Sequence, residues 1–203
     1  PATDPGSAWA EQLPATRGVH TEPTARVLAL DNGATRVAVV RVDSALTSAT
    51  LRARVLAGFE AEGLAARLLL YATHTHAGPG RMMPPARLGS ATGTDFVSLI
   101  MDHYDAEVEA RFAAAIVGAA REAFGALVPV AVGTAAVEAG AFNHDRRCEN
   151  DPVYGPEFRD TAMTVIRLDA VDEQGQPSRP LAALLHYAMH GTVLPSENPL
   201  LST

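Results

Sequence analysis

The sequence contains no lysine and a single cysteine, and both scarcities narrow the range of functions. All 16 basic residues are arginine, and with 23 acidic residues the formal net charge is −7. Such a chain has no broad basic surface to hold phosphates, so we expect no nucleic-acid partner. Cys148 cannot form an internal disulfide and lacks the spacing of a cysteine-based metal site. We interpret it as an incidental thiol, with a catalytic cysteine as the alternative.

Long apolar runs are also absent. No run approaches the roughly 20 residues that a transmembrane helix needs, so we expect no membrane span. The chain starts at Pro1, without an initiating methionine and without a recognisable signal peptide. We therefore expect its true start to lie upstream, where a cleaved secretion signal would make the protein extracytoplasmic.

Two motifs of common enzyme classes are missing as well. Gly78-Pro79-Gly80 is not a P-loop, and no Gly-x-Gly-x-x-Gly leads from a strand into a helix, so nucleotide binding is disfavoured. A Gly-x-Ser-x-Gly elbow, which would carry a serine nucleophile, does not occur either.

Apolar residues make up 47% of the 203 residues, enough for one domain with a core or for part of a larger domain. Residues 1–17 are rich in Pro, Ala and Thr and predict a loose lead-in. Two β-prone runs, residues 25–30 and 35–43, flank Asp31-Asn32-Gly33-Ala34, and Asn-Gly is typical of a tight hairpin turn.

The rest of the chain alternates between helical and strand patterns. Residues 48–62 predict a helix capped by Ser48 or Thr47 and ended by Gly63. Residues 67–73, apolar on both faces, predict a buried central strand. The longest helical pattern starts at Asp95 as N-cap and runs to Phe124. Further strands are expected at 128–139, 161–169 and 181–187. The order β-β-α-β-α-β-β-β predicts an α/β fold with mixed sheets and flanking helices.

The segment from Tyr71 to Gly80 carries the clearest chemistry. His74 and His76 follow a predicted strand, and in an extended chain residues two apart point the same way. Two imidazoles would then face one point, and neutral imidazole is a favoured ligand of zinc. Gly78 and Gly80 let the backbone turn close to a bound group. The alternative is two histidines in a polar strand end without a metal.

A second pair of histidines lies near the end of the chain. His190 follows a strand and precedes Gly191-Thr192, as His74 precedes a glycine-bearing loop, so His190 is the better third ligand. We interpret His186, inside an apolar strand, as a hydrogen-bonded core histidine, and His103, within the long helical pattern, as structural.

A polar loop between the later strands contains adjacent arginines, Arg146 and Arg147. Arginine stabilises an oxyanion or binds a carboxylate or phosphate with two hydrogen bonds. A solvated or salt-bridged loop is the other interpretation. The loop residues Met82, Met83 and Leu88 suggest an entrance for an acyl chain, although methionine clusters also serve packing.

These motifs resemble those of the neutral/alkaline (non-lysosomal) ceramidase family. Residues 71–80 resemble its Ala-Thr-His-Thr-His-x-Gly-Pro-Gly signature, and His190 in residues 188–194 resembles its second metal-binding stretch. Residues 18–26 resemble the segment before its first hairpin. Asn143 with Arg146 and Arg147 is similar to its Asn-Arg loop, with two residues inserted.

The resemblance implies a zinc-dependent amidase that hydrolyses the N-acyl bond of ceramide. It implies that His74 and His190 ligate zinc and that His76 assists catalysis beside the metal. In our working mechanism, Arg146 or Arg147 steadies the developing oxyanion or a polar part of the substrate. The family's other ligands, a Glu and a Tyr, and a Ser-bearing loop lie further along the chain than Thr203. Residues 18–203 are therefore expected to be the N-terminal portion, an incomplete half, of a zinc amidohydrolase catalytic domain.

Two alternatives stay open. A zinc hydrolase of the same kind would act on a different amide or ester, because no lipid groove is visible in the sequence. A non-catalytic subunit would need a second polypeptide that carries the rest of the catalytic domain, and would expose an apolar patch to it.

Overall fold

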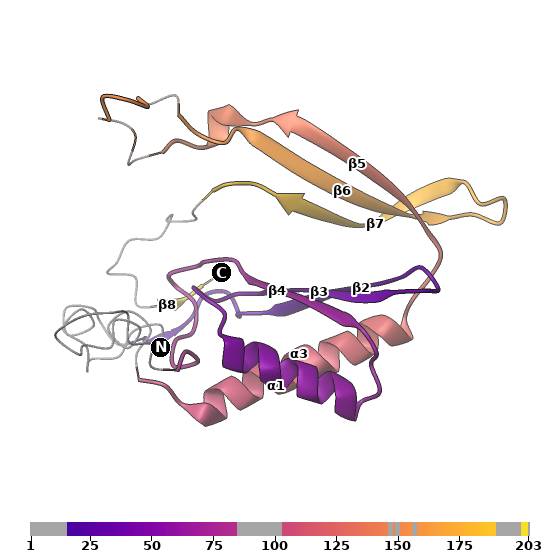
Figure 1. Cartoon of the computed structure of the whole chain (residues 1–203), viewed down its shortest axis with the longest axis horizontal. Coiled ribbons are helices and arrows are strands. Elements are labelled where there is room, and N and C mark those ends of the chain that lie inside the picture. The colour runs from indigo at the N-terminus through magenta and orange to yellow at the C-terminus, as the bar shows by residue number, and fades with distance from the viewer. Residues whose placement is uncertain are drawn as a thin grey trace. The chain divides into compact units, whose positions relative to one another are not determined.

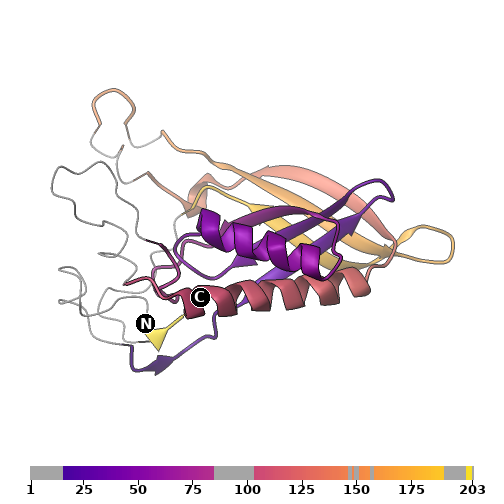
Figure 2. The same ribbon diagram turned by 60° about the horizontal axis from the view of Figure 1, so that its bottom comes forward.

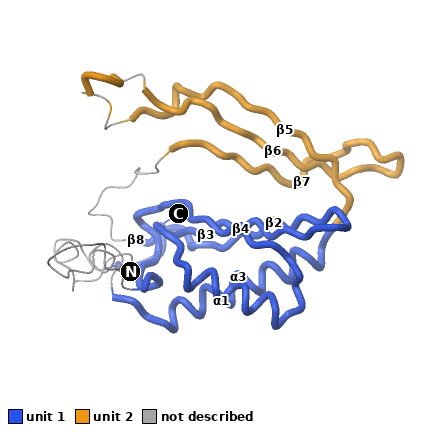
Figure 3. Tube along the Cα trace, viewed as in Figure 1, with its two compact units in different colours: residues 1–127, 191–203 blue, residues 128–190 orange. Residues whose placement is uncertain are grey.

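The computed structural model describes residues 16–84, 103–145, 148, 151–155, 158–189 and 200–202. The chain forms two compact units, residues 1–127 with 191–203 (unit 1) and residues 128–190 (unit 2), coloured separately in Figure 3. The sequence patterns had given no sign of this division. Each unit is built round its own three-stranded sheet, and together they form the mixed α/β fold that the order of elements predicted.

The described residues of unit 1 form one three-stranded sheet, two α-helices and a short pair of strands. Its elements are β1 (Gly18–Val19), β2 (Ala25–Asp31), β3 (Arg36–Val42), α1 (Ala49–Ala61), β4 (Arg67–Ala72), α3 (Ala106–Gly125) and β8 (Leu200–Leu201). The main sheet has the order β2-β3-β4, with β2 and β3 antiparallel and β3 and β4 parallel. Both helices lie along one face of it (Figures 1 and 2), and β1 pairs with β8 in parallel.

The predicted hairpin and first helix are confirmed. β2 and β3 pair from Ala25↔Val42 to Asp31↔Arg36, and the turn between them is held by Asn32, whose side-chain oxygen accepts from the backbone N–H of Thr35 at 2.8 Å. At the start of α1, the Ser48 hydroxyl accepts from the N–H of Leu51 at 2.9 Å, as an N-cap does.

The core of unit 1 lies between its helices and one face of its sheet. Strands and helices contribute in similar number: Ala29, Ala38, Val40, Val42 and Leu68 from the sheet, and Leu51, Val55, Phe59, Ala113, Ile116, Ala120 and Phe124 from α1 and α3. Small side chains on α3 let it pack closely on α1 and β2, because an alanine leaves room for the neighbouring backbone.

Two predictions about unit 1 are wrong. β4 is an edge strand and not a central one within the described residues, and Leu69 and Tyr71 are 58% and 43% exposed on the face without helices. The long helix does not run unbroken from Asp95: residues 103–105 are not helical, and Asp105 caps α3 by accepting from the N–H groups of Glu107 and Val108. Asp105, ten residues after the expected Asp95, is therefore the N-cap of α3. Residues 95–102 lie outside the described part.

Unit 2 is an antiparallel meander. β5 (Val130–Glu138), β6 (Ala162–Val171) and β7 (Pro177–His186) pair in that order, and the 3-10 turn η2 (Gly140–Phe142) follows β5. The predicted strands are present, although β7 begins four residues earlier than expected, at Pro177. Two irregularities in the β6–β7 register lie near Asp169 and Val171.

Candidate functional site

The candidate site lies where the parallel strands β3 and β4 end. Val42 and Ala72 are paired partners, and the N–H of Thr73 donates to the carbonyl of Val42 at 3.0 Å. The segments that follow β3 and β4 therefore leave the sheet side by side, so that residues 43–46 lie next to residues 73–77. The carboxyl edge of parallel strands is the usual place for a site in an α/β fold.

His74 is held by a backbone contact across this edge. Its Nδ1 lies 2.5 Å from the carbonyl oxygen of Ala45. A carbonyl oxygen only accepts, so Nδ1 donates in this contact, and in a neutral imidazole Nε2 is then the nitrogen with the lone pair. Histidines that ligate metals commonly donate their second nitrogen to a carbonyl in this way. His74 also has a φ of 62°, a conformation that non-glycine residues rarely adopt, and such strain clusters at functional sites.

His76 lies beside His74, as predicted, but not for the reason that the sequence suggested. The ring centroids are 5.1 Å apart and the ring planes meet at 84°. The prediction assumed an extended chain, whereas β4 ends at Ala72 and the positive φ of His74 turns the backbone before His76. The two imidazoles meet because of this turn, and strand alternation plays no part.

Close packing of the backbone keeps the turn in place. A Cβ atom on Gly78 would lie 3.1 Å from the carbonyl oxygen of Asp43 and 2.8 Å from Cγ2 of Thr75, so only glycine fits at this approach. Asp43 is 2% exposed, and its carboxylate accepts from the N–H and hydroxyl of Thr24 and pairs with Arg41 at 2.5 Å. The residue whose backbone Gly78 approaches is thus itself held by a buried, hydrogen-bonded side chain.

The donors present fit part of a zinc site. Two imidazoles lie together, and imidazole is a favoured ligand of zinc. Across the ranges that the structure describes, no group of three or more His, Cys, Asp or Glu side chains is placed to hold a metal ion. His190, the predicted third ligand, and Arg146 and Arg147, the predicted oxyanion partners, lie outside the described residues.

The structure corrects the interpretation of several other residues. His186 is exposed at the end of β7 and is not a core histidine, and His103 precedes α3, exposed, instead of lying within it. Met82 is 1% exposed and packs inside unit 1, so it does not line an entrance, while Leu88 lies outside the described residues. Burial and the nearby carboxylates of Asp145 and Asp151 raise the pKa of the Cys148 thiol, which disfavours a catalytic cysteine.

Asn143 links two segments of unit 2 that precede predicted site residues. Its side-chain amide donates to the carbonyl of Asp160 at 2.7 Å and to that of Ala188 at 3.1 Å. It therefore links the loop before Arg146 to the segment just before His190. The sequence had pointed to Asn143 only through the family resemblance.

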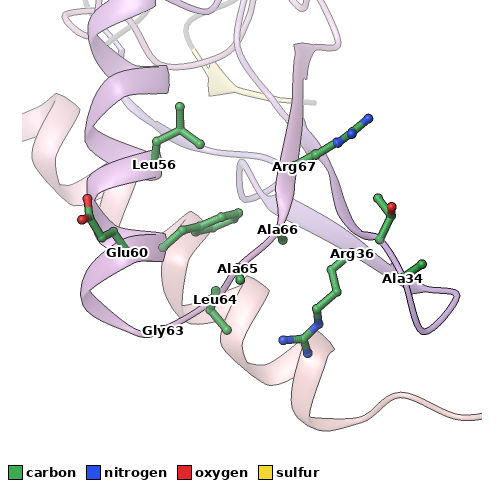
Figure 4. Close-up of a pocket in the computed structure, with 11 residues that line it drawn as sticks. Ala34, Arg36, Leu56, Glu60, Gly63, Leu64, Ala65, Ala66 and Arg67 are labelled. Atoms are coloured by element: carbon green, nitrogen blue, oxygen red, sulfur yellow. The ribbon is translucent and has the colours of Figure 1, made fainter.

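A separate open pocket of about 630 Å³ lies at the opposite end of strands β3 and β4 (Figure 4). It is lined by residues at the amino ends of β3 and β4, among them Arg36 and Arg67, and by the end of α1. At about 3.3 Å per residue, the six residues of β4 put it some 20 Å from His74. The two arginines point away from each other in Figure 4, so this pocket does not gather charge around one ligand.

The chain belongs to the neutral/alkaline non-lysosomal ceramidase family, because the sequence model of the family's N-terminal part matches residues 6–203. One similar solved structure is a ceramidase complexed with C2, with a TM-score of 0.75 and 22% identity over 93% of this chain. Another is the neutral ceramidase from Pseudomonas aeruginosa, with a TM-score of 0.73 and 23% identity over 91% of this chain.

This chain spans 29% of the length of each of these two structures, so the likeness concerns the fold of their corresponding part. No curated protein sequence matches the chain. None of the helices in the described part combines the length and the apolar character that crossing a membrane requires.

Proposed function

We propose that residues 18–203 are the N-terminal portion of the catalytic domain of a zinc-dependent amidohydrolase that cleaves the N-acyl bond of ceramide or a related N-acyl lipid. Membership of the ceramidase family supports the reaction class. The observation that carries the zinc assignment is the hydrogen bond from Nδ1 of His74 to the Ala45 carbonyl, which fixes the tautomer that a ligand needs.

The roles of the residues follow from this arrangement. A zinc ion, when bound, lowers the pKa of a bound water and polarises an acyl carbonyl. His74 presents Nε2 as a ligand, and His190 is its proposed partner. His76, whose ring lies 5.1 Å from that of His74, is close enough to accept a proton from a water held near His74 and return it to the leaving amine. Arg146 and Arg147 are proposed to stabilise the developing oxyanion.

Substitution of the two adjacent histidines in the protein at its full natural length tests these roles separately. His74→Ala should lower zinc affinity at least about 100-fold, because a direct ligand is lost, and hydrolysis should fall with it. His76→Ala should keep the zinc and lower kcat by about 10²- to 10⁴-fold, the usual share of a general acid–base group. His103→Ala, an exposed histidine before α3, is the matched control and should change neither.

The readouts are bound zinc by mass spectrometry and release of fatty acid from N-acyl substrates of varied chain length, with matched esters. Unchanged zinc content and hydrolysis in His74→Ala would refute the proposal. Hydrolysis of esters alone would instead indicate a different substrate. A wild-type protein that hydrolyses no substrate alone, but becomes active when a second polypeptide is added, would indicate the subunit role.

A further inference from the structure

The turn that carries His76 is held by Ser202, which lies 127 positions after Thr75 in the chain. The hydroxyl of Thr75 donates to the carbonyl of Ser202 at 3.3 Å, and the N–H of Ser202 donates to the carbonyl of Ala77 at 2.9 Å. One residue thus bonds to the neighbours of His76 on both sides. The Thr75 hydroxyl also accepts from the N–H of Ala77 at 3.3 Å, which closes a small ring of hydrogen bonds around His76.

Ser202 is itself fixed from the other side. It is 5% exposed, and its hydroxyl lies 3.4 Å from that of Thr21 and 3.5 Å from Nδ1 of His20. The backbone just before Ser202 is held by the pairing of β1 with β8 and by the N–H of His20, which donates to the carbonyl of Leu201 at 2.8 Å. Segments 18–21, 75–77 and 200–202 therefore form one hydrogen-bonded cluster, which we call the Ser202 clasp.

The clasp and the Ala45 contact hold different histidines. His74 is oriented through its own ring by the Ala45 carbonyl on the β3 side. Within the turn, Ser202 bonds to Thr75 and Ala77, which flank His76. A change in the clasp should therefore move His76 and leave the metal-facing nitrogen of His74 where it is.

We infer that Thr75 is a positioning residue that fixes His76 through Ser202, so that the β1–β8 pair sets the efficiency of proton transfer without taking part in metal binding. This inference rests on the proposed function for its catalytic consequence, while the clasp itself is a property of the structure. Misplacing a reacting group by about 1 Å costs up to about 100-fold in rate, so a loosened turn should cost about tenfold.

The test compares Thr75→Val with Thr75→Ser in the protein at its full natural length. Valine keeps the shape but loses the hydroxyl and both of its bonds, whereas serine keeps the hydroxyl and loses the methyl group that occupies the space beside Gly78 where a Cβ atom would lie. Thr161→Val is the matched control, since the Thr161 hydroxyl bonds to Glu138 in unit 2 at 2.8 Å, away from the histidines along the chain.

Thr75→Val should lower kcat about tenfold, with KM and zinc content unchanged. It should also speed hydrogen–deuterium exchange in a peptide covering residues 73–78. Thr75→Ser and Thr161→Val should match the wild type in all four measurements.

Wild-type exchange and wild-type kcat in Thr75→Val would overturn the inference, as would an equal loss in Thr75→Ser, which would assign the effect to packing. Loss of zinc in Thr75→Val would also overturn it, because the clasp would then act on His74. If the wild-type protein proves inactive on N-acyl substrates, the proposed function fails alone, and the exchange experiment still decides whether Thr75 holds the turn.

Discussion

The β2-β3-β4 sheet of unit 1 and the β5-β6-β7 sheet of unit 2 have three strands each, yet they bury very different shares of their side chains. In unit 1 two helices cover one face of the sheet, and a continuous cluster of 12 buried residues lies between the helices and that face. In unit 2 the described residues include no α-helix, and only Ala139 and Leu168 are buried apolar residues. The comparison teaches that, in the described residues, a sheet of this chain buries a core only where helices cover one of its faces.

The exposed apolar residues sharpen the contrast. Val132 and Leu185 of unit 2 are 60% and 64% exposed, whereas Leu51 and Val55 of α1 are at 0%. Unit 1 has the apolar burial that stabilises a fold on its own, and unit 2 relies on its two antiparallel ladders.

A matched pair of leucine substitutions gives the largest expected difference between the units. Leu51→Ala should lower the free energy of unfolding by about 3 kcal/mol, because it leaves a cavity in a closed core. Leu185→Ala should cost less than about 1 kcal/mol, because that side chain is mostly in solvent. Urea denaturation of the protein at its full natural length measures both. Equal costs would show that Leu185 is buried by something beyond its own sheet, and would break the comparison.

What the sequence predicted well depends on short-range signals. The hairpin followed from Asn32-Gly33, and α1 followed from Ser48 and the apolar spacing that ends at Gly63, because each feature lies within a few residues of the backbone that it shapes. The position of β4 could not be predicted in the same way. Apolar residues on both faces of a strand do not reveal whether the chain supplies a neighbour for each edge.

The site shows the same limit more strongly. The His74–His76 pair was found from its motif, but the contacts that orient it come from Ala45 and Ser202, which carry no recognisable pattern. A backbone carbonyl has the same chemistry in every residue, so its role appears only when the fold brings it to a ring nitrogen. The contributions of His190, Arg146 and Arg147 stay predictions.

A buried carboxylate gives the second test of the comparison. Glu109 of α3 is fully buried and joins α1 to α3: its carboxylate accepts from Thr50, Arg54, Tyr104 and Ser48 at 2.5 to 3.1 Å. In unit 2 the pair of Arg167 and Asp169, at 2.8 Å, is partly open to solvent. Glu109→Gln should cost about 2 kcal/mol, since buried donors lose a charged acceptor. Asp169→Asn should cost less than about 1 kcal/mol.

The dependence of stability on pH tests the role of the Glu109 carboxylate. Burial alone would raise the pKa of Glu109, but hydrogen bonds from Thr50, Tyr104, Arg54 and Ser48 outweigh it and lower the pKa below its ordinary value. The stabilisation is therefore fully present above the pKa of an unfolded Glu and is lost as pH falls through the lowered folded value. The difference in unfolding free energy between wild type and Glu109→Gln, measured by urea denaturation, should be complete at pH 7 and should close only as the pH falls below the lowered pKa of Glu109. A gap that stays constant with pH would contradict the assignment.

The smallest expected effect compares the hairpin turns, where the two units should behave alike. Gly33 between β2 and β3 and Gly175 between β6 and β7 have φ values of 83° and 77°, and nothing lies within 4 Å of a Cβ atom added at either position. Alanine would therefore meet no clash and would cost only backbone strain, about 1 kcal/mol at each turn. The measurement is again urea denaturation, with Gly118→Ala on α3, which also has open space for a Cβ, as a control that should be neutral or slightly stabilising. Equal costs at Gly33 and Gly175 would place the difference between the units in side-chain burial alone. A cost confined to Gly33 would mean that the β6–β7 turn yields without affecting the rest of the chain, and that unit 2 unfolds before unit 1.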